Sequence, residues 1–107
     1  MDEEIAFMAR AEGRQPTVVR LIGELDLVGV PQVRSVLAGL DGDVELDCSG
    51  LDFIDAAGLR VIQEAHECCA VRGSKLVLVD PSPVVEHVLG IVELDTVLLI
   101  QRNGEVS

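Results

Sequence analysis

Short apolar segments alternate with longer amphipathic segments along this chain, and this alternation most strongly limits the folds open to it. Five segments have the composition of β-strands, at residues 5–10, 17–25, 43–49, 75–79 and 96–100. Three segments carry apolar residues three or four positions apart, as helices do, and begin near Pro31, Ala56 and Pro83. The order β-β-α-β-α-β-α-β predicts an α/β fold, in which the first hairpin supplies an antiparallel edge and right-handed crossovers join later, parallel strands.

Local patterns set the expected ends of these elements. The segment 43–49 alternates apolar residues with acids, and the Ser49-Gly50 pair predicts the start of a loop that leads to Asp55. The unbroken apolar run at 75–79 predicts a strand that is covered on both faces. Ser82, followed by a proline, is placed to cap the third helix.

The length of the chain suits a single domain. We expect the 107 residues to form one unit, residues 1–107, with its folded core at about 5–101 and a polar tail at 102–107. Two domains, each with its own hydrophobic core, would need a longer chain.

The charge of the chain limits its partners. Eight Lys and Arg stand against nineteen Asp and Glu, which gives a net charge of −11. This charge repels phosphate backbones over a Debye length of about 8 Å in physiological salt. Nucleic acid is therefore not expected as a partner, whereas a basic protein surface is compatible with the charge.

The termini and the cysteines indicate a cytoplasmic protein. The first ten residues, MDEEIAFMAR, have neither the basic region nor the apolar run of a signal peptide. No segment reaches the ~20 apolar residues of a membrane span, so direct membrane insertion is not expected. Three cysteines without framework spacing predict reduced thiols.

The residues that follow the second and third strand segments are the candidate site. Asp26 and Asp55 lie just past these segments, where open α/β sheets usually meet ligands and partners, and we expect them to be neighbours. Catalysis by paired carboxylates is disfavoured, because no Ser, His, Lys or Tyr lies close to Asp55 in the sequence. Asp55 is a natural helix N-cap. Gly58 in the first helical turn indicates close approach, either by another part of the backbone or by a partner.

A metal site and a cofactor are not predicted. His66, Cys68 and Cys69 lie close together in the sequence, but adjacent cysteines on a helix point about 100° apart and no second ligand pair completes a four-ligand site. We expect buried thiols and a half-exposed imidazole instead, and we expect His87 to lie on the surface.

Several of these segments together resemble the STAS domain of the bacterial anti-sigma factor antagonist family. The resemblance rests on IGELDL, on VELDCSGLDFIDAAGLRVI and on the stretch from RGSKLVLVDPSPVVEHVLG to VELDTVLLI, and covers about residues 5–101. It implies an α/β, STAS-like mixed sheet of four to five strands with about three helices. It also implies a binding protein rather than an enzyme, whose partner is an anti-sigma factor that is also a serine kinase of the histidine-kinase-like ATPase type.

The resemblance implies a docking role for one group of residues and reveals one departure. In that family the loop usually reads D-S-S-G, and the second serine accepts phosphate from the partner. Here Ala57 occupies that position, so the usual phosphorylation is not expected, and Ser49 is at a different position of the loop. The residues expected to contact the partner are Asp26, Asp55, Ala56, Ala57, Gly58 and Arg60.

Two functions follow from the resemblance. The first is an antagonist that is always competent to bind an anti-sigma factor, or a relative whose partner is not a kinase. The second is a STAS subunit of an ABC-type lipid transporter or of a stress-signalling scaffold. Both a monomer and a weak dimer are compatible with the sequence.

Overall fold

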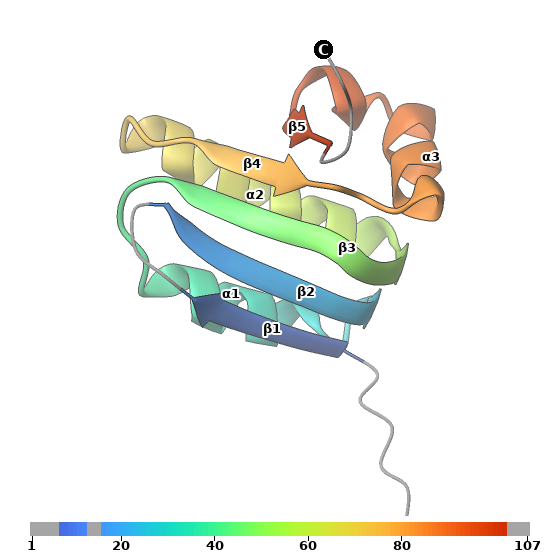
Figure 1. The fold of residues 1–107 in the computed structure, drawn as a ribbon, viewed down its shortest axis with the longest axis horizontal. Coiled ribbons are helices and arrows are strands. Elements are labelled where there is room, and N and C mark those ends of the chain that lie inside the picture. The colour runs from blue at the N-terminus through green and yellow to red at the C-terminus, as the bar shows by residue number, and fades with distance from the viewer. Residues whose placement is uncertain (1–6, 13–15, 103–107) are drawn as a thin grey trace, which may run out of the picture.

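The strands and helices follow the predicted order. The computed structural model describes residues 7–12 and 16–102. Its elements are β1 (Phe7–Glu12), β2 (Thr17–Leu25), α1 (Val30–Ala38), β3 (Val44–Ile54), α2 (Ala56–Val71), β4 (Leu76–Val79), α3 (Pro83–Ile91), the 3-10 helix η1 (Leu94–Thr96) and β5 (Leu99–Gln101) (Figure 1). The first two residues of the predicted strand 5–10, and residues 103–107 of the predicted tail, lie outside the described residues.

The strands form one mixed sheet in the order β1-β2-β3-β4-β5. β1 is antiparallel to β2 and pairs with it from Phe7 opposite Gly23 to Glu12 opposite Val18. The three other pairings are parallel. The fold class predicted from the sequence, a mixed α/β sheet with an antiparallel edge and three helices, is confirmed.

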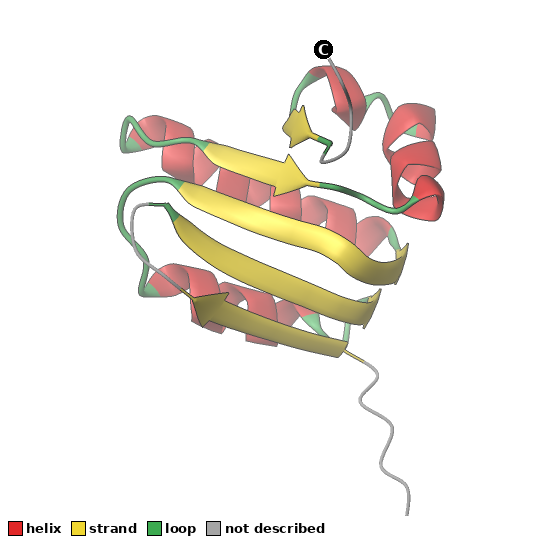
Figure 2. Ribbon diagram, in the orientation of Figure 1, coloured by secondary structure: helices red, strands yellow, loops and turns green. Residues whose placement is uncertain are grey.

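Helices α1 and α2 cover one face of the sheet (Figure 2). On β2, Val19 and Leu21 point into this layer and are fully buried, whereas Arg20 between them is exposed and forms an ion pair of 2.9 Å with Asp47 of β3. The opposite face of the sheet is therefore the wetter one at this position. The prediction that residues 75–79 are covered on both faces is wrong at Val77, which points away from α2 and is only half-buried.

Aliphatic side chains fill the core between the sheet and the helices. The largest fully buried side chains are Leu21, Leu25, Leu46, Leu51, Ile54, Ile62, Leu76, Leu78, Leu89, Val19, Val33 and Val44. Burial of such side chains is the main favourable contribution to folding, about 1.5–3 kcal/mol for each one. In the part of the chain that the structure describes, no helix is long and apolar enough to cross a membrane.

Strand β3 is longer than predicted. It does not end at the Ser49-Gly50 pair but continues to Ile54, because β2 pairs with it along this whole length. The register between the two strands shifts twice, and each shift inserts one extra residue into β3. The inserted residues change which face each side chain meets, so that Leu51 and Ile54 are both buried although three positions separate them. The Ser49-Gly50 pair that predicted a loop therefore lies inside the strand, at the first of these bulges.

The last strand is shorter than predicted. Residues 96–100 were expected to be a strand, but the chain forms η1 at Leu94–Thr96 and only Leu99–Gln101 pairs with β4. Glu93 adopts a left-handed conformation with φ of 61°, and the amides of Val97 and Leu98 donate to the carbonyl of Leu94. Leu98, directly after this turn, is buried in the core.

Candidate functional site

Strands β2 and β3 end side by side, and this edge of the sheet carries the candidate site. Leu25 and Ile54 are paired in the sheet, and the Asp55 amide donates a hydrogen bond of 3.1 Å to the Leu25 carbonyl. The segments that follow the two strands therefore leave the sheet next to each other. The prediction that Asp26 and Asp55 are neighbours is confirmed.

Asp55 caps helix α2. Its backbone is extended, its Oδ1 accepts a hydrogen bond of 2.9 Å from the Gly58 amide, and its carbonyl accepts one of 2.9 Å from the Leu59 amide. The carboxylate also lies at the positive end of the helix dipole. Capping of this kind contributes about 1 kcal/mol to helix stability, and the capping role predicted from the sequence is confirmed.

Gly58 allows α2 to pack against the ends of both strands. A Cβ atom at this position would lie 2.8 Å from the Leu25 carbonyl oxygen, 2.8 Å from Leu25 Cγ and 2.8 Å from Ile54 Cγ1. Of the two reasons that the sequence left open for this glycine, close approach by another part of the backbone is the one observed. Gly58 is buried, so it lies beneath the surface that it helps to shape.

The first two turns of α2 present small and charged residues. Ala56 is exposed, Ala57 is half-buried against the core, and Arg60 is exposed. A side chain at position 57 lies in the first turn, where unpaired backbone amides and the helix dipole favour negative charge. Ala57 has no hydroxyl that could carry a phosphate.

Asp26 shapes the loop that joins β2 to α1. Its Oδ1 accepts a hydrogen bond of 3.0 Å from the Val28 amide, and its carbonyl accepts one of 3.0 Å from the Gly29 amide. This turn leaves the side chains of Leu27 and Val28 exposed to 71% and 86%. One oxygen of the Asp26 carboxylate is therefore engaged within the loop.

Three exposed apolar side chains at this edge were missed by the sequence analysis. They are Leu27 and Val28, after β2, and Phe53, which is 42% exposed near the end of β3. The available signal was the apolar pair that interrupts a loop-forming stretch in GELDLVG. The sequence does not show whether the side chains of Leu27 and Val28 fold inward or face solvent. The hydrogen bonds of the Asp26 turn leave both exposed.

The described residues give no support for catalytic or metal chemistry. Among residues 7–12 and 16–102, no group of three or more His, Cys, Asp or Glu side chains could hold a metal ion. Burial, together with the nearby Asp47 carboxylate, raises the pKa of the Cys48 thiol to about 12, so this thiol is unreactive. His66 is half-buried, and its Nδ1 has no hydrogen-bond partner within the described part of the chain.

Comparison with known proteins identifies the family. The protein-family model described as "Mlab, STAS domain" matches residues 8–101. An anti-sigma F factor antagonist from Lysinibacillus sphaericus is 33% identical over 88 residues, which cover 77% of this chain and 74% of that protein.

Solved structures have the same fold. An anti-sigma factor antagonist from Mycobacterium paratuberculosis superposes with a TM-score of 0.77 at 20% identity, over 89% of this chain and 85% of that one. The anti-sigma factor antagonist SpoIIAA in its unphosphorylated form gives a TM-score of 0.75 at 25% identity, over 94% of this chain and 90% of that one. The chain therefore belongs to the STAS domain family of anti-sigma factor antagonists, which are regulators rather than enzymes.

Proposed function

We propose that this chain binds an anti-sigma factor of the serine-kinase, histidine-kinase-like ATPase type through the edge of the sheet where β2 and β3 end. The docking surface consists of Asp26, Leu27, Val28, Phe53, Asp55, Ala56, Ala57 and Arg60. By occupying its partner, the chain releases a sigma factor in the cytoplasm, where transcription takes place. Gly58 contributes from beneath, by letting α2 approach the sheet.

The observation that carries this proposal is the exposed apolar group on the docking surface. Leu27, Val28, Phe53, Ala56 and Ala57 all lie within three residues of the paired Leu25 and Ile54. Apolar side chains at the centre of an interface, with charged residues at its rim, are typical of protein docking sites. The carboxylates of Asp26 and Asp55 and the guanidinium of Arg60 would orient the partner and set the rate of encounter more than the affinity.

The absence of a hydroxyl at position 57 supports a permanently active form. A phosphate there would add about −1.5 to −2 charges at pH 7, two residues from Asp55 and within the docking surface. Such a charge would be costly to bury against a close-fitting partner. Ala57 cannot accept this phosphate, so the partner cannot switch the chain off by this route.

Affinity capture from the native host tests the binding surface. Wild-type chain should recover an anti-sigma factor, and Leu27→Asp should weaken this capture at least about tenfold because it buries an unpaired charge in the interface. Ile91→Asp is the matched control, since Ile91 is 67% exposed on α3 and lies outside the docking surface. Recovery of an ABC-type ATPase instead would favour the alternative, a STAS subunit of a transporter. Equal capture by both variants would refute the proposed surface.

A second experiment tests the switch. Ala57→Ser should gain one phosphoryl group when it is incubated with the captured kinase and ATP, as measured by intact-mass spectrometry, whereas wild-type chain should gain none. Ala57→Asp should lose binding, since it places a fixed charge at the same position. If Ala57→Asp binds as tightly as wild type, charge at this position is not the off signal.

A further inference from the structure

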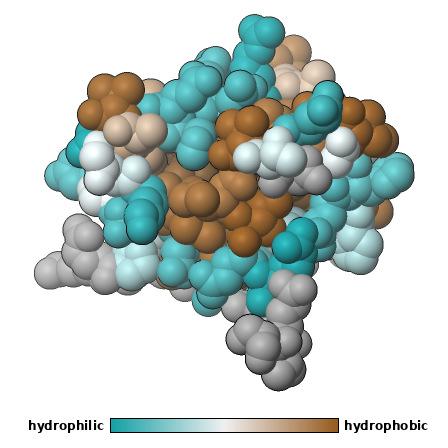
Figure 3. Space-filling view, turned by 90° about the horizontal axis from the view of Figure 1, so that it is seen from above, coloured by the Kyte–Doolittle hydropathy of each residue, from teal (hydrophilic) through white to brown (hydrophobic). Residues whose placement is uncertain are grey.

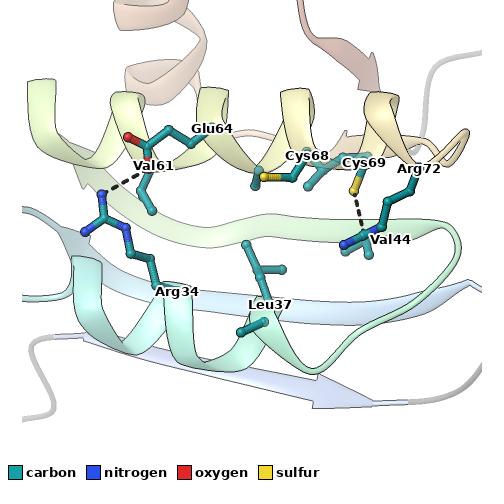
Figure 4. Close-up of a pocket in the computed structure, with 11 residues that line it drawn as sticks. Arg34, Leu37, Val44, Val61, Glu64, Cys68, Cys69 and Arg72 are labelled. Atoms are coloured by element: carbon teal, nitrogen blue, oxygen red, sulfur yellow. Dashed lines mark hydrogen bonds and ion pairs between the residues drawn. The ribbon is translucent and has the colours of Figure 1, made fainter.

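A groove between α1 and α2 lies on the helical layer, away from the docking surface. It has a volume of about 310 Å³. Its walls come from both helices and its floor from the sheet, as Figure 4 shows, and its lining is mostly apolar. The lining residues are Arg34, Leu37, Ala38, Val44, Val61, Glu64, Ala65, Cys68, Cys69, Arg72 and Leu76.

The two ends of the groove differ in their electrostatics. At one end, Arg34 of α1 reaches across to Glu64 of α2 in an ion pair of 3.0 Å, so both charges are compensated (Figure 4). At the other end, and among residues 7–12 and 16–102, the Arg72 guanidinium donates only to the Cys69 sulfur, at 3.5 Å. No carboxylate within the described residues pairs with Arg72, although acids outnumber bases nineteen to eight in this chain.

We propose that this groove binds a medium-chain fatty acid, with the aliphatic chain along Leu37, Val61 and Ala65 and the carboxylate at Arg72. An apolar cleft with one unpaired cation at its end matches a ligand that is apolar along its length and anionic at one end. Ligand pockets usually measure about 300–1,000 Å³, and this groove lies at the lower limit, which suits a single chain and not a two-chain lipid.

Neighbouring charges make the expected binding modest. Burial is the main cause that raises the pKa of the Cys69 thiol, and the Asp43 carboxylate raises it further, so Asp43 also acts at this end of the groove. The carbonyl end of the α2 dipole is next to Arg72. Both oppose an anion. Arg72 is also exposed, so a carboxylate paired with it remains partly hydrated. The chain of the ligand must therefore supply most of the affinity, and the carboxylate sets its direction in the groove.

The test is a titration of the ¹⁵N-labelled chain with decanoate, followed by ¹H–¹⁵N NMR below the concentration at which decanoate forms micelles. Amides of Leu37, Ala65 and Cys68 should shift in a saturable way. Acetate, which has the charge without the chain, should cause no saturable shift. Decan-1-ol, which has the chain without the charge, should bind about threefold more weakly, because an exposed ion pair contributes only modestly to affinity.

Two pairs of variants separate the parts of the proposal. Ala65→Leu should fill the groove and weaken decanoate at least tenfold, whereas Ala70→Leu, at an exposed position on the same helix, should not. Arg72→Gln should weaken decanoate about threefold, whereas Arg10→Gln, which removes an equal charge at an exposed position on β1 outside the groove, should have no effect. The amide spectrum of each variant without ligand verifies its fold.

Three results would overturn the inference. The first is a set of decanoate shifts centred outside the groove, on a second apolar region where Ile91, Val92, Val97 and Leu99 are exposed. Figure 3 shows apolar surface on the side of the molecule that is seen from above relative to Figure 1. The second is equal affinity for decanoate and decan-1-ol. The third is unchanged binding by Ala65→Leu. Because the groove shares no residue with the docking surface, each of these results leaves the proposed function untouched.

Discussion

The contact between Gly58 and the ends of the two strands makes a quantitative prediction. In Gly58→Ala the new methyl group would meet three atoms at 2.8 Å, and one of them is the Leu25 carbonyl oxygen, which cannot rotate away as a side chain can. Overpacking of this kind usually costs about 1–3 kcal/mol. Alanine recovers up to about 1 kcal/mol of helix propensity, so we expect a net loss of about 1–2 kcal/mol.

Two other glycines serve as controls because their surroundings separate crowding from backbone strain. A Cβ at Gly39 would meet nothing within 4 Å, and its φ of −92° suits any residue, so Gly39→Ala should be neutral or stabilising by up to about 1 kcal/mol. Gly73 is equally open but has φ of +77°, so Gly73→Ala should cost about 1–2 kcal/mol through strain alone.

Urea unfolding followed by far-UV circular dichroism measures these changes, since the chain has no Trp or Tyr to serve as a fluorescent probe. The midpoint should fall for Gly58→Ala without a change in the slope of the transition. In thermal unfolding the same variant should lose about 4–8 °C for each kcal/mol. A Gly58→Ala chain that is as stable as Gly39→Ala would refute the close approach of α2 to β2.

Further predictions concern the cap, an ion pair and the thiols. Asp55→Ala should cost about 1 kcal/mol in urea unfolding, whereas Asp55→Asn, which keeps an oxygen acceptor, should cost less. The hydrogen bond from Arg102 holds the pKa of Glu86 below its usual value of 4.5, so the stability that this pair provides should be present above that value and lost as the pH falls through the lowered pKa. Arg102→Gln should remove this part of the pH dependence of the unfolding midpoint. At pH 8 iodoacetamide should label Cys68, which is exposed, and should leave Cys48 unlabelled until urea unfolds the chain, as peptide mass mapping would show. Labelling of Cys48 in the folded chain would contradict its burial.

The sequence predicted most elements because local and tertiary preferences agree in them. Strand 17–25 was predicted with its observed bounds, and helix α2 begins at the expected residue after its Asp55 cap. The errors occur where pairing between distant segments overrides the local pattern. Pairing with β2 extends β3 beyond Ser49, and a helical turn at Leu94–Thr96 takes the place of the start of the last predicted strand.

For the candidate site, the sequence determined which residues are available and the tertiary structure decided which of them face a partner. The order of the strands is enough to bring Asp26 and Asp55 to one edge, because parallel strands end at the same side of a sheet. The absence of a hydroxyl at Ala57 is likewise a property of the sequence alone. The burial of Gly58 and the exposure of Leu27 and Val28 depend on contacts and turns that only the packed chain creates, and no local pattern contains them.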